Sequence, residues 1–146
     1  MSGVIDTNLL LYGVNQDATE HSAARRFLER IGQAADPWYL TDGILYEFLR
    51  VSTHPRVFPS PLTSAEALEF VSPLIRAGNV HVLDPTDDHW LVLEEVLRSL
   101  SHPNGNLFFD IRTVVLMREH GVRRIFTTDT DFLQFESIAV VNPLKG

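Results

Sequence analysis

Glu47 and Asp110 each occupy a position where a hydrophobic residue is expected. Both fall within an apolar stripe of a predicted helix, with the i, i+3, i+4, i+7 spacing of a helix face that packs on a core. The two stripes are Ile44, Glu47, Phe48 and Val51, and Leu107, Asp110, Ile111 and Val114. A buried carboxylate needs a partner, because an unpaired buried charge is costly. The chain has a single lysine, Lys145, and Arg50 and Arg112 are expected to point elsewhere, so the pattern predicts a shared metal ion.

Three further aspartates follow the ends of predicted strands. Asp6 comes directly after the first predicted strand, Asp129 follows the fourth, and Asp131 lies two residues further on. In open α/β sheets, sites form outside the carboxyl ends of the strands where the strand order reverses, so these side chains are expected to lie together. Each also has a structural interpretation. Asp6 could cap the helix that follows it, and Asp129 or Asp131 could cap a short turn at residues 132–135.

The chemistry of such a cluster is that of a hard divalent cation. Carboxylates gathered in one pocket repel one another, and their pKa values rise when no cation lies between them. Mg²⁺ or Mn²⁺ relieves this repulsion, because both ions prefer oxygen ligands and keep bound waters. Two such ions can hold the attacking and the leaving oxygen of a phosphodiester. The five acids therefore predict metal-assisted hydrolysis of a phosphodiester, in which Thr7 and Asn8 could assist Asp6.

The elements that position these residues alternate between strands and helices. Predicted strands cover residues 4–5, 38–41, 80–83, 124–127 and 138–141, and predicted helices cover residues 8–13, 18–35, 43–53, 64–77, 87–100 and 106–120. Asp42 is the expected N-cap of the third helix, and Thr63 to Glu66 matches a capping box before the fourth. The alternation predicts an α/β protein with a mostly parallel five-stranded sheet. All 146 residues are expected to form a single domain.

Composition excludes some classes of protein. The net charge of −7 argues against binding nucleic acid through its backbone alone, although a nuclease could carry the excess negative charge in its metal site. The absence of cysteine rules out disulfides and thiolate metal sites. The N-terminus lacks the features of a signal peptide, and no apolar stretch of about 18 residues occurs. We therefore expect a cytoplasmic protein with no membrane segment.

Four motifs occur in the order seen in PIN domains. They are Ile5-Asp6-Thr7-Asn8-Leu9-Leu10, Glu47-Phe48-Leu49-Arg50, Asp110 at the start of its helix, and Thr127-Thr128-Asp129-Thr130-Asp131-Phe132. The chain resembles the VapC toxins of type II toxin–antitoxin systems over nearly its whole length. The resemblance implies a three-layer α/β/α fold, Mg²⁺- or Mn²⁺-dependent endoribonuclease activity, a homodimer, and a VapB-type antitoxin as partner. It places Asp6, Glu47, Asp110 and Asp129 in the catalytic site, with Asp131 as an auxiliary metal ligand.

Three other interpretations share some of these features. Receiver domains and haloacid-type phosphatases also have an aspartate after the first strand, but they use a late internal lysine that is absent here, and the phosphatase pattern has aspartate in place of Asn8. A non-catalytic interaction module of the same fold would be expected to lack a site acid. A PIN nuclease that processes RNA without a toxin role differs little in sequence, and only the short length favours the toxin.

Arginines and aromatic residues supply candidates for substrate or partner contacts. Arg56, in the proline-rich loop of residues 54–62, is a candidate for binding RNA phosphate. Two further groups are Arg25, Arg26 and Arg30, and Arg123 and Arg124. Four aromatic residues could belong to a dimer or antitoxin surface, and packing in the core would explain them equally well. They are Tyr46, Phe58, Phe108 and Phe109. The scattered histidines, His89 among them, are expected mainly at the surface or in loops.

Overall fold

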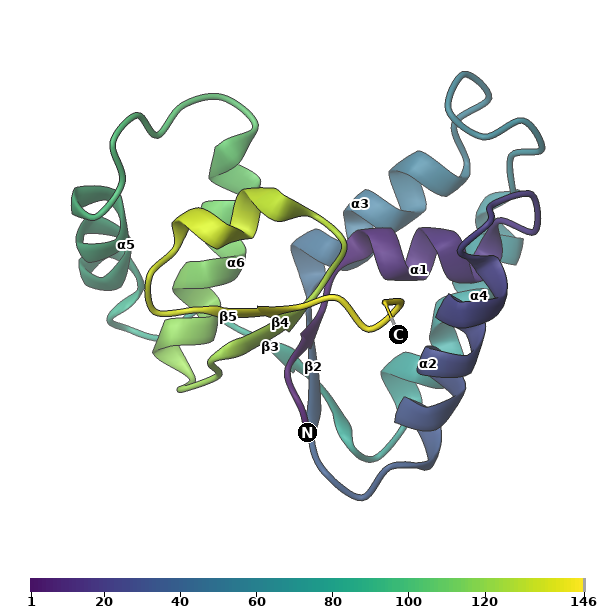
Figure 1. Ribbon diagram of the computed structural model, residues 1–146, viewed down its shortest axis with the longest axis horizontal. Coiled ribbons are helices and arrows are strands. Elements are labelled where there is room, and N and C mark those ends of the chain that lie inside the picture. Colours follow the sequence, from purple (N-terminus) through teal and green to yellow (C-terminus); the bar gives the residue numbers. More distant parts are fainter. Residues whose placement is uncertain (146) are drawn as a thin grey trace.

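A parallel five-stranded sheet forms the centre of the computed structural model, which describes residues 1–145 (Figure 1). The strands are β1 (Val4–Ile5), β2 (Trp38–Thr41), β3 (Val80–Leu83), β4 (Arg124–Phe126) and β5 (Ala139–Val141). Every strand pair is parallel, which confirms the α/β class and the five expected strands. Parallel strands need crossover connections, and the helical segments between them supply these.

The strand order reverses beside β1. The order is β3-β2-β1-β4-β5, so the chain first builds outward from β1 to β3 and then crosses back to add β4 on the other side of β1. Val4 lies opposite Ile125 and Ile5 opposite Phe126, which brings the carboxyl ends of β1 and β4 side by side. The predicted switch point therefore exists, and the segments beginning at Asp6 and Thr127 leave the sheet next to each other.

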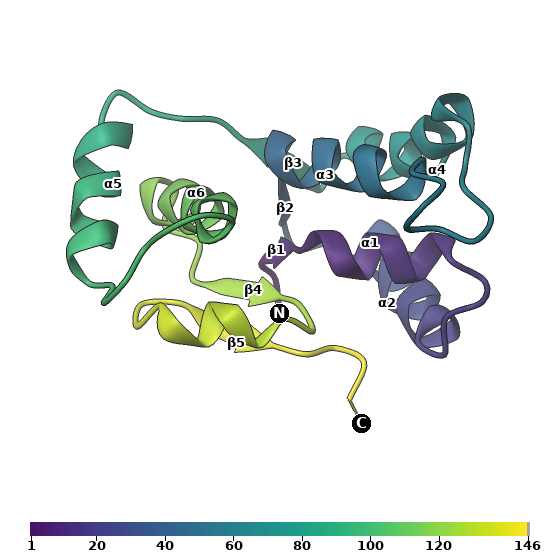
Figure 2. The ribbon, with the colours of Figure 1, turned by 90° about the horizontal axis from the view of Figure 1, so that it is seen from above.

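Helices cover both faces of the sheet. One face carries α1 (Thr7–Val14), α2 (His21–Gln33), α3 (Asp42–Ser52) and α4 (Ser64–Arg76). The other carries α5 (His89–Arg98) and α6 (Leu107–Glu119), with the short 3₁₀ helix η1 (Thr130–Gln134) beside β5 (Figures 1 and 2). This arrangement is the predicted three-layer α/β/α fold.

Three predicted helix starts need correction. The helix predicted from residue 18 begins at His21. The N-cap of α3 is Thr41, whose hydroxyl accepts a hydrogen bond from the Ile44 N–H, and Asp42 is the first helical residue. Asp87 and Asp88 precede α5 rather than forming its first turn. The capping box of α4 is confirmed, because the side chain of each cap residue accepts a hydrogen bond from the other's backbone N–H.

The core lies around β1 and α6. Val4 and Ile5 are fully buried, as expected for the central strand of a sheet that is covered on both faces. In α6, Ile111 and all residues from Thr113 to Met117 are buried, so this helix is surrounded by protein on most sides. Burial begins one residue after Asp110, which places this carboxylate where α6 emerges from the core.

Each helix within residues 1–145 is too short or too polar to cross a membrane.

Candidate active site

The hydroxyl group of Thr127 connects the ends of β1 and β4. Thr127 is fully buried and donates a hydrogen bond to Asp6 Oδ2 at 2.7 Å. The same oxygen accepts hydrogen bonds from Asn8 Nδ2 at 3.1 Å and from the backbone N–H of Asp129 at 3.0 Å. One hydroxyl therefore fixes the Asp6 carboxylate and the backbone that carries Asp129. Asn8 was expected to orient Asp6, but it acts through Thr127, a residue to which the sequence assigned no role.

Asp6 is held toward the site and not toward the helix that follows it. It occupies the N-cap position of α1, but its side chain forms no capping hydrogen bond. Its carboxylate instead accepts the hydrogen bond from Thr127. The cap interpretation of Asp6 is therefore wrong, and its side chain lines a pocket at the carboxyl edge of the sheet.

Asp110, Asp129 and Asp131 lie close enough to share one metal ion. Each offers a carboxylate oxygen, and the three oxygens lie within 4.8 Å of one another. Asp129, and not Asp131, caps η1, because Asp129 Oδ1 accepts a hydrogen bond from the Asp131 N–H at 2.9 Å. Since that bond uses Asp129 Oδ1, its Oδ2 remains available to a cation. The exposed Asp131 side chain lies at the open side of the group.

Glu47 reaches the same pocket from the solvent side. The prediction that it faces the core is wrong, because Glu47 is exposed. The buried residues of α3 are Ile44, Phe48 and Ser52, which are spaced by four residues. Glu47 lies at the edge of that face and lines the pocket together with Asp6 and Asp110. Asp110 is closer to expectation, being partly buried beside the fully buried Ile111.

Burial and neighbouring charges shift the protonation of two of the acids, Asp110 and Asp6. Burial raises the pKa of Asp110 to about 7, and the negative charges of Asp6, Asp129, Asp131 and Glu47 add to the shift. Burial also raises the pKa of Asp6 to about 6, with contributions from Glu47 and Asp129, while the hydrogen bond from Thr127 partly offsets the rise. All five predicted acids thus act on one site, and their mutual repulsion penalises the fully ionised state.

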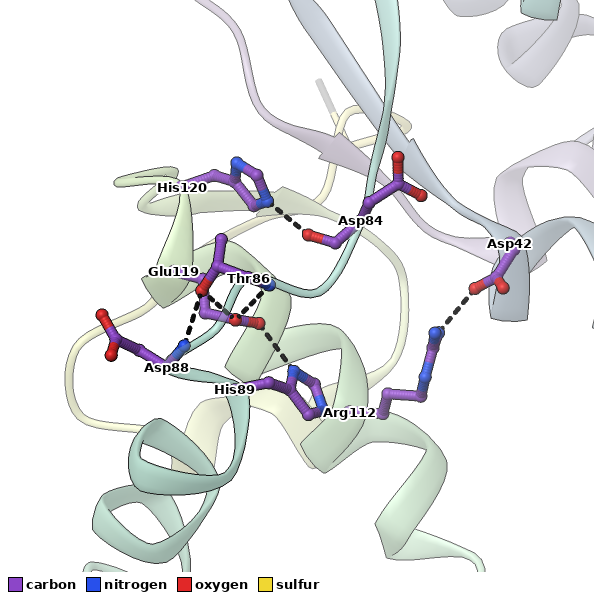
Figure 3. A network of polar contacts seen from close by, with 8 residues as sticks. All are labelled: Asp42, Asp84, Thr86, Asp88, His89, Arg112, Glu119 and His120. Atoms are coloured by element: carbon purple, nitrogen blue, oxygen red, sulfur yellow. Dashed lines mark hydrogen bonds and ion pairs between the residues drawn. The ribbon is translucent and has the colours of Figure 1, made fainter.

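Arg50 and Arg112 line the acidic pocket, which has a volume of about 320 Å³, so the prediction that both point elsewhere is wrong. Arg112 Nη1 pairs with Asp42 Oδ1 at 2.7 Å, joining α6 to the start of α3 (Figure 3). Two aromatic residues, Tyr46 and Phe109, complete this side of the pocket. Phe58 belongs to the core instead.

The far end of α6 is anchored by a buried carboxylate. The Glu119 side chain is fully buried and accepts hydrogen bonds from the N–H and hydroxyl of Thr86 and from His89 Nδ1 at 2.7 Å (Figure 3). Burial alone would raise the pKa of Glu119, but these hydrogen bonds outweigh it and lower the pKa. His89 is therefore a largely buried structural partner and not a loop residue. This anchor holds the helix that presents Asp110 at its other end.

Comparisons with known proteins agree with this architecture. Residues 3–138 match the PIN domain family model. Ribonuclease VapC48 of Mycobacterium tuberculosis is 30% identical over 146 residues, with all of both chains covered. Ribonuclease VapC43 of the same organism is 30% identical over 142 residues, which cover 97% of this chain and 95% of that protein. The chain therefore belongs to the PIN-domain family, among the VapC ribonucleases.

A solved structure shows the same fold. The match is to a chain in the crystal structure of VapBC2 from Rickettsia felis, with a TM-score of 0.69. In that structure VapBC2 is bound to a DNA fragment from its promoter. The match covers 97% of this chain and 98% of that chain at 14% identity. At this identity the likeness concerns the fold alone, and it confirms the predicted PIN-like α/β architecture.

The raised pKa of Asp110 predicts a pH-dependent gain from Asp110→Asn. In the folded, metal-free protein Asp110 binds its proton more tightly than in the unfolded chain, so wild-type stability falls as pH rises from about 4 toward the folded pKa of about 7. The variant lacks this penalty. In the presence of a metal chelator, the melting temperature of the variant should exceed that of the wild type. This difference in melting temperature should be larger at about pH 8 than at about pH 4.5. Asp17→Asn, at an exposed site, is the control, and an advantage independent of pH would contradict the assignment.

The Thr127 hydroxyl predicts a loss of stability in Thr127→Val. Valine keeps the shape of threonine but leaves the Asp6 carboxylate and the Asp129 N–H without their partner, which costs about 1–3 kcal/mol of unfolding free energy. Thr113→Val is the matched control, because Thr113 is also buried and its hydroxyl donates a hydrogen bond to the Phe109 carbonyl one helical turn away, a bond that links no distant segments. Denaturant titration at about pH 8 measures both variants. Equal losses would show that the Thr127 hydroxyl has no special role.

Proposed function

We propose that this protein is a metal-dependent endoribonuclease and the toxin of a type II toxin–antitoxin pair. The observation that carries the proposal is the convergence of five carboxylates at the carboxyl edge of the sheet, at the point where the strand order reverses. They come from the ends of β1 and β4 and from two helices on opposite faces of the sheet. An α/β scaffold forms ligand sites at this place.

The residues present fit Mg²⁺ or Mn²⁺. Every charged group in the cluster is a carboxylate, and hard divalent cations prefer oxygen ligands. None of the five acids forms an ion pair with a basic group within residues 1–145. Burial and the neighbouring carboxylates raise the pKa values of Asp6 and Asp110, so the ionised form of the site is not compensated by a paired cation. A divalent cation would supply that charge.

Each acid has a distinct part in this proposal. Asp6, Asp110 and Asp129 hold the cation from the protein side, and the first and third of these are positioned by Thr127. Glu47 closes the site from its exposed side, and Asp131 is an auxiliary ligand at the opening. A bound cation would lower the pKa of a water molecule and stabilise negative charge on the phosphate oxygens. The surrounding carboxylates would accept protons released during hydrolysis.

The proposed partners follow from the family. VapC48 and VapC43 are named ribonucleases, and the chain of similar fold belongs to the VapBC2 structure. We infer that this chain acts on RNA, is inhibited by a VapB-type antitoxin and assembles as a homodimer. We further propose that residues 1–146 act as one domain, since the family match already spans residues 3–138.

RNA cleavage by the Asp6→Asn variant tests the proposal. The variant keeps the size of the side chain and an oxygen that can accept the Thr127 hydrogen bond, but it removes the charge that would hold the cation. Cleavage of total RNA with Mn²⁺, followed by mapping of new RNA ends, should fall by about 100-fold or more. Asp17→Asn should cleave like wild type. Equal cleavage by Asp6→Asn and wild type would refute the assigned mechanism, and no cleavage by wild type would refute the nuclease.

A further inference from the structure

Two exposed aromatic side chains lie in the pocket directly beside the acids. Tyr46 precedes Glu47 on α3, and Phe109 precedes Asp110 on α6. Their residues are 72% and 66% exposed, and both line the acidic pocket. Within residues 1–145 neither ring pairs with another aromatic ring. The two helices that carry the acids thus also present two free aromatic faces.

Aromatic rings left open in a pocket indicate a ligand that covers them. Large apolar side chains are normally buried, and those that remain open in a hollow often mark a binding site. Trp90 is a useful contrast. It is 74% exposed, but it packs edge-on against His89 on α5 and does not line this pocket.

Two guanidinium groups share the pocket with the rings. Arg50, one turn after Tyr46 on α3, is exposed and forms no ion pair within residues 1–145. Arg112 is held by Asp42 and lies across Gly43, where an added Cβ would stand 3.2 Å from Arg112 Nη1. The Arg112–Asp42 pair therefore forms part of the wall, and Arg50 is the cation free to meet a ligand.

The combination suits a nucleotide. Aromatic faces stack on bases of any sequence, and guanidinium groups bind phosphate oxygens through paired hydrogen bonds. Acids that hold a cation would fix a neighbouring phosphate. The base must be unpaired, because in a duplex both faces of each base are covered by its neighbours. The pocket volume of about 320 Å³ lies at the lower end of the range for small-ligand sites, which suits one nucleotide and not a duplex.

We propose that Tyr46 and Phe109 stack against an unpaired base next to the scissile phosphate, and that Arg50 binds the phosphate of that nucleotide. The inference rests on the proposed ribonuclease function and deepens it, since it assigns the residues that select single-stranded RNA. It also explains why each aromatic residue stands beside an acid in the sequence. A base held by the rings places its own phosphate at the carboxylates.

Binding without cleavage tests this subsite. The reference protein is the Asp110→Asn variant without added metal, in which hydrolysis is removed and phosphate repulsion is reduced. Three probes are used: an unstructured oligoribonucleotide of about 12 nucleotides, the same strand annealed to its complement, and an abasic sugar–phosphate strand of equal length. Fluorescence anisotropy measures the dissociation constants. Each test substitution is added singly to the reference protein, and these are Tyr46→Ala, Phe109→Ala and Arg50→Gln. Tyr46→Phe is the variant that keeps the aromatic ring, and Trp90→Ala is the control at a site outside the pocket.

The expected pattern separates base from backbone contacts. The reference should prefer the single strand over both the duplex and the abasic strand. Each ring-to-alanine change should weaken single-strand binding by about 5- to 100-fold and leave abasic-strand binding unchanged. Arg50→Gln should weaken binding of both the single strand and the abasic strand. Tyr46→Phe and Trp90→Ala should leave the binding of both strands unchanged.

Three outcomes would overturn the subsite. In the first, the ring variants weaken binding of the single strand and of the abasic strand equally. In the second, they weaken binding of neither strand. In the third, the reference protein binds none of the probes. The last outcome would favour a protein segment as the occupant. Cleavage by wild type is a separate readout, so a failed nuclease and a failed subsite are distinguishable.

Discussion

Electrostatic repulsion within the acidic site is the constraint on which the rest of the structure depends. Five carboxylates share one edge of the sheet, and the pKa values of Asp110 and Asp6 are raised to about 7 and about 6. An arrangement that disfavours its own ionised form is held together by the scaffold and not by the acids themselves. A protein under no functional demand would gain stability by losing one of them. In the function that we propose, a divalent cation would turn the same arrangement into a binding site.

The scaffold opposes this repulsion through contacts distant in sequence. Thr127 joins the ends of β1 and β4 with three hydrogen bonds at one oxygen. The buried Glu119 anchors one end of α6 while the other end presents Asp110. The Arg112–Asp42 pair ties α6 to α3 across the sheet edge. Exposed ion pairs contribute little to stability, so we regard that pair mainly as a means of fixing the pocket wall.

The sequence allowed prediction of the strand set, the layers and the convergence of the five acids, because periodicity, strand ends and motif order are local features. It misjudged Glu47, since a position three residues after Ile44 lies beside, and not on, the buried face defined by Ile44, Phe48 and Ser52. The role of Thr127 depends on a partner 121 positions away, and the Arg112–Asp42 pair depends on how two helices meet. Such contacts arise from tertiary packing, for which one sequence contains no local signal.

We propose that these carboxylates hold divalent cations. Anomalous scattering from a crystal of the wild-type protein grown with Mn²⁺ tests it most directly, because it locates the ion independently of activity. We expect a peak in the acidic pocket, about 2 Å from carboxylate oxygens of Asp6, Asp110 and Asp129. A pocket without a peak at saturating Mn²⁺, or ions bound only by acids outside this group, would contradict it.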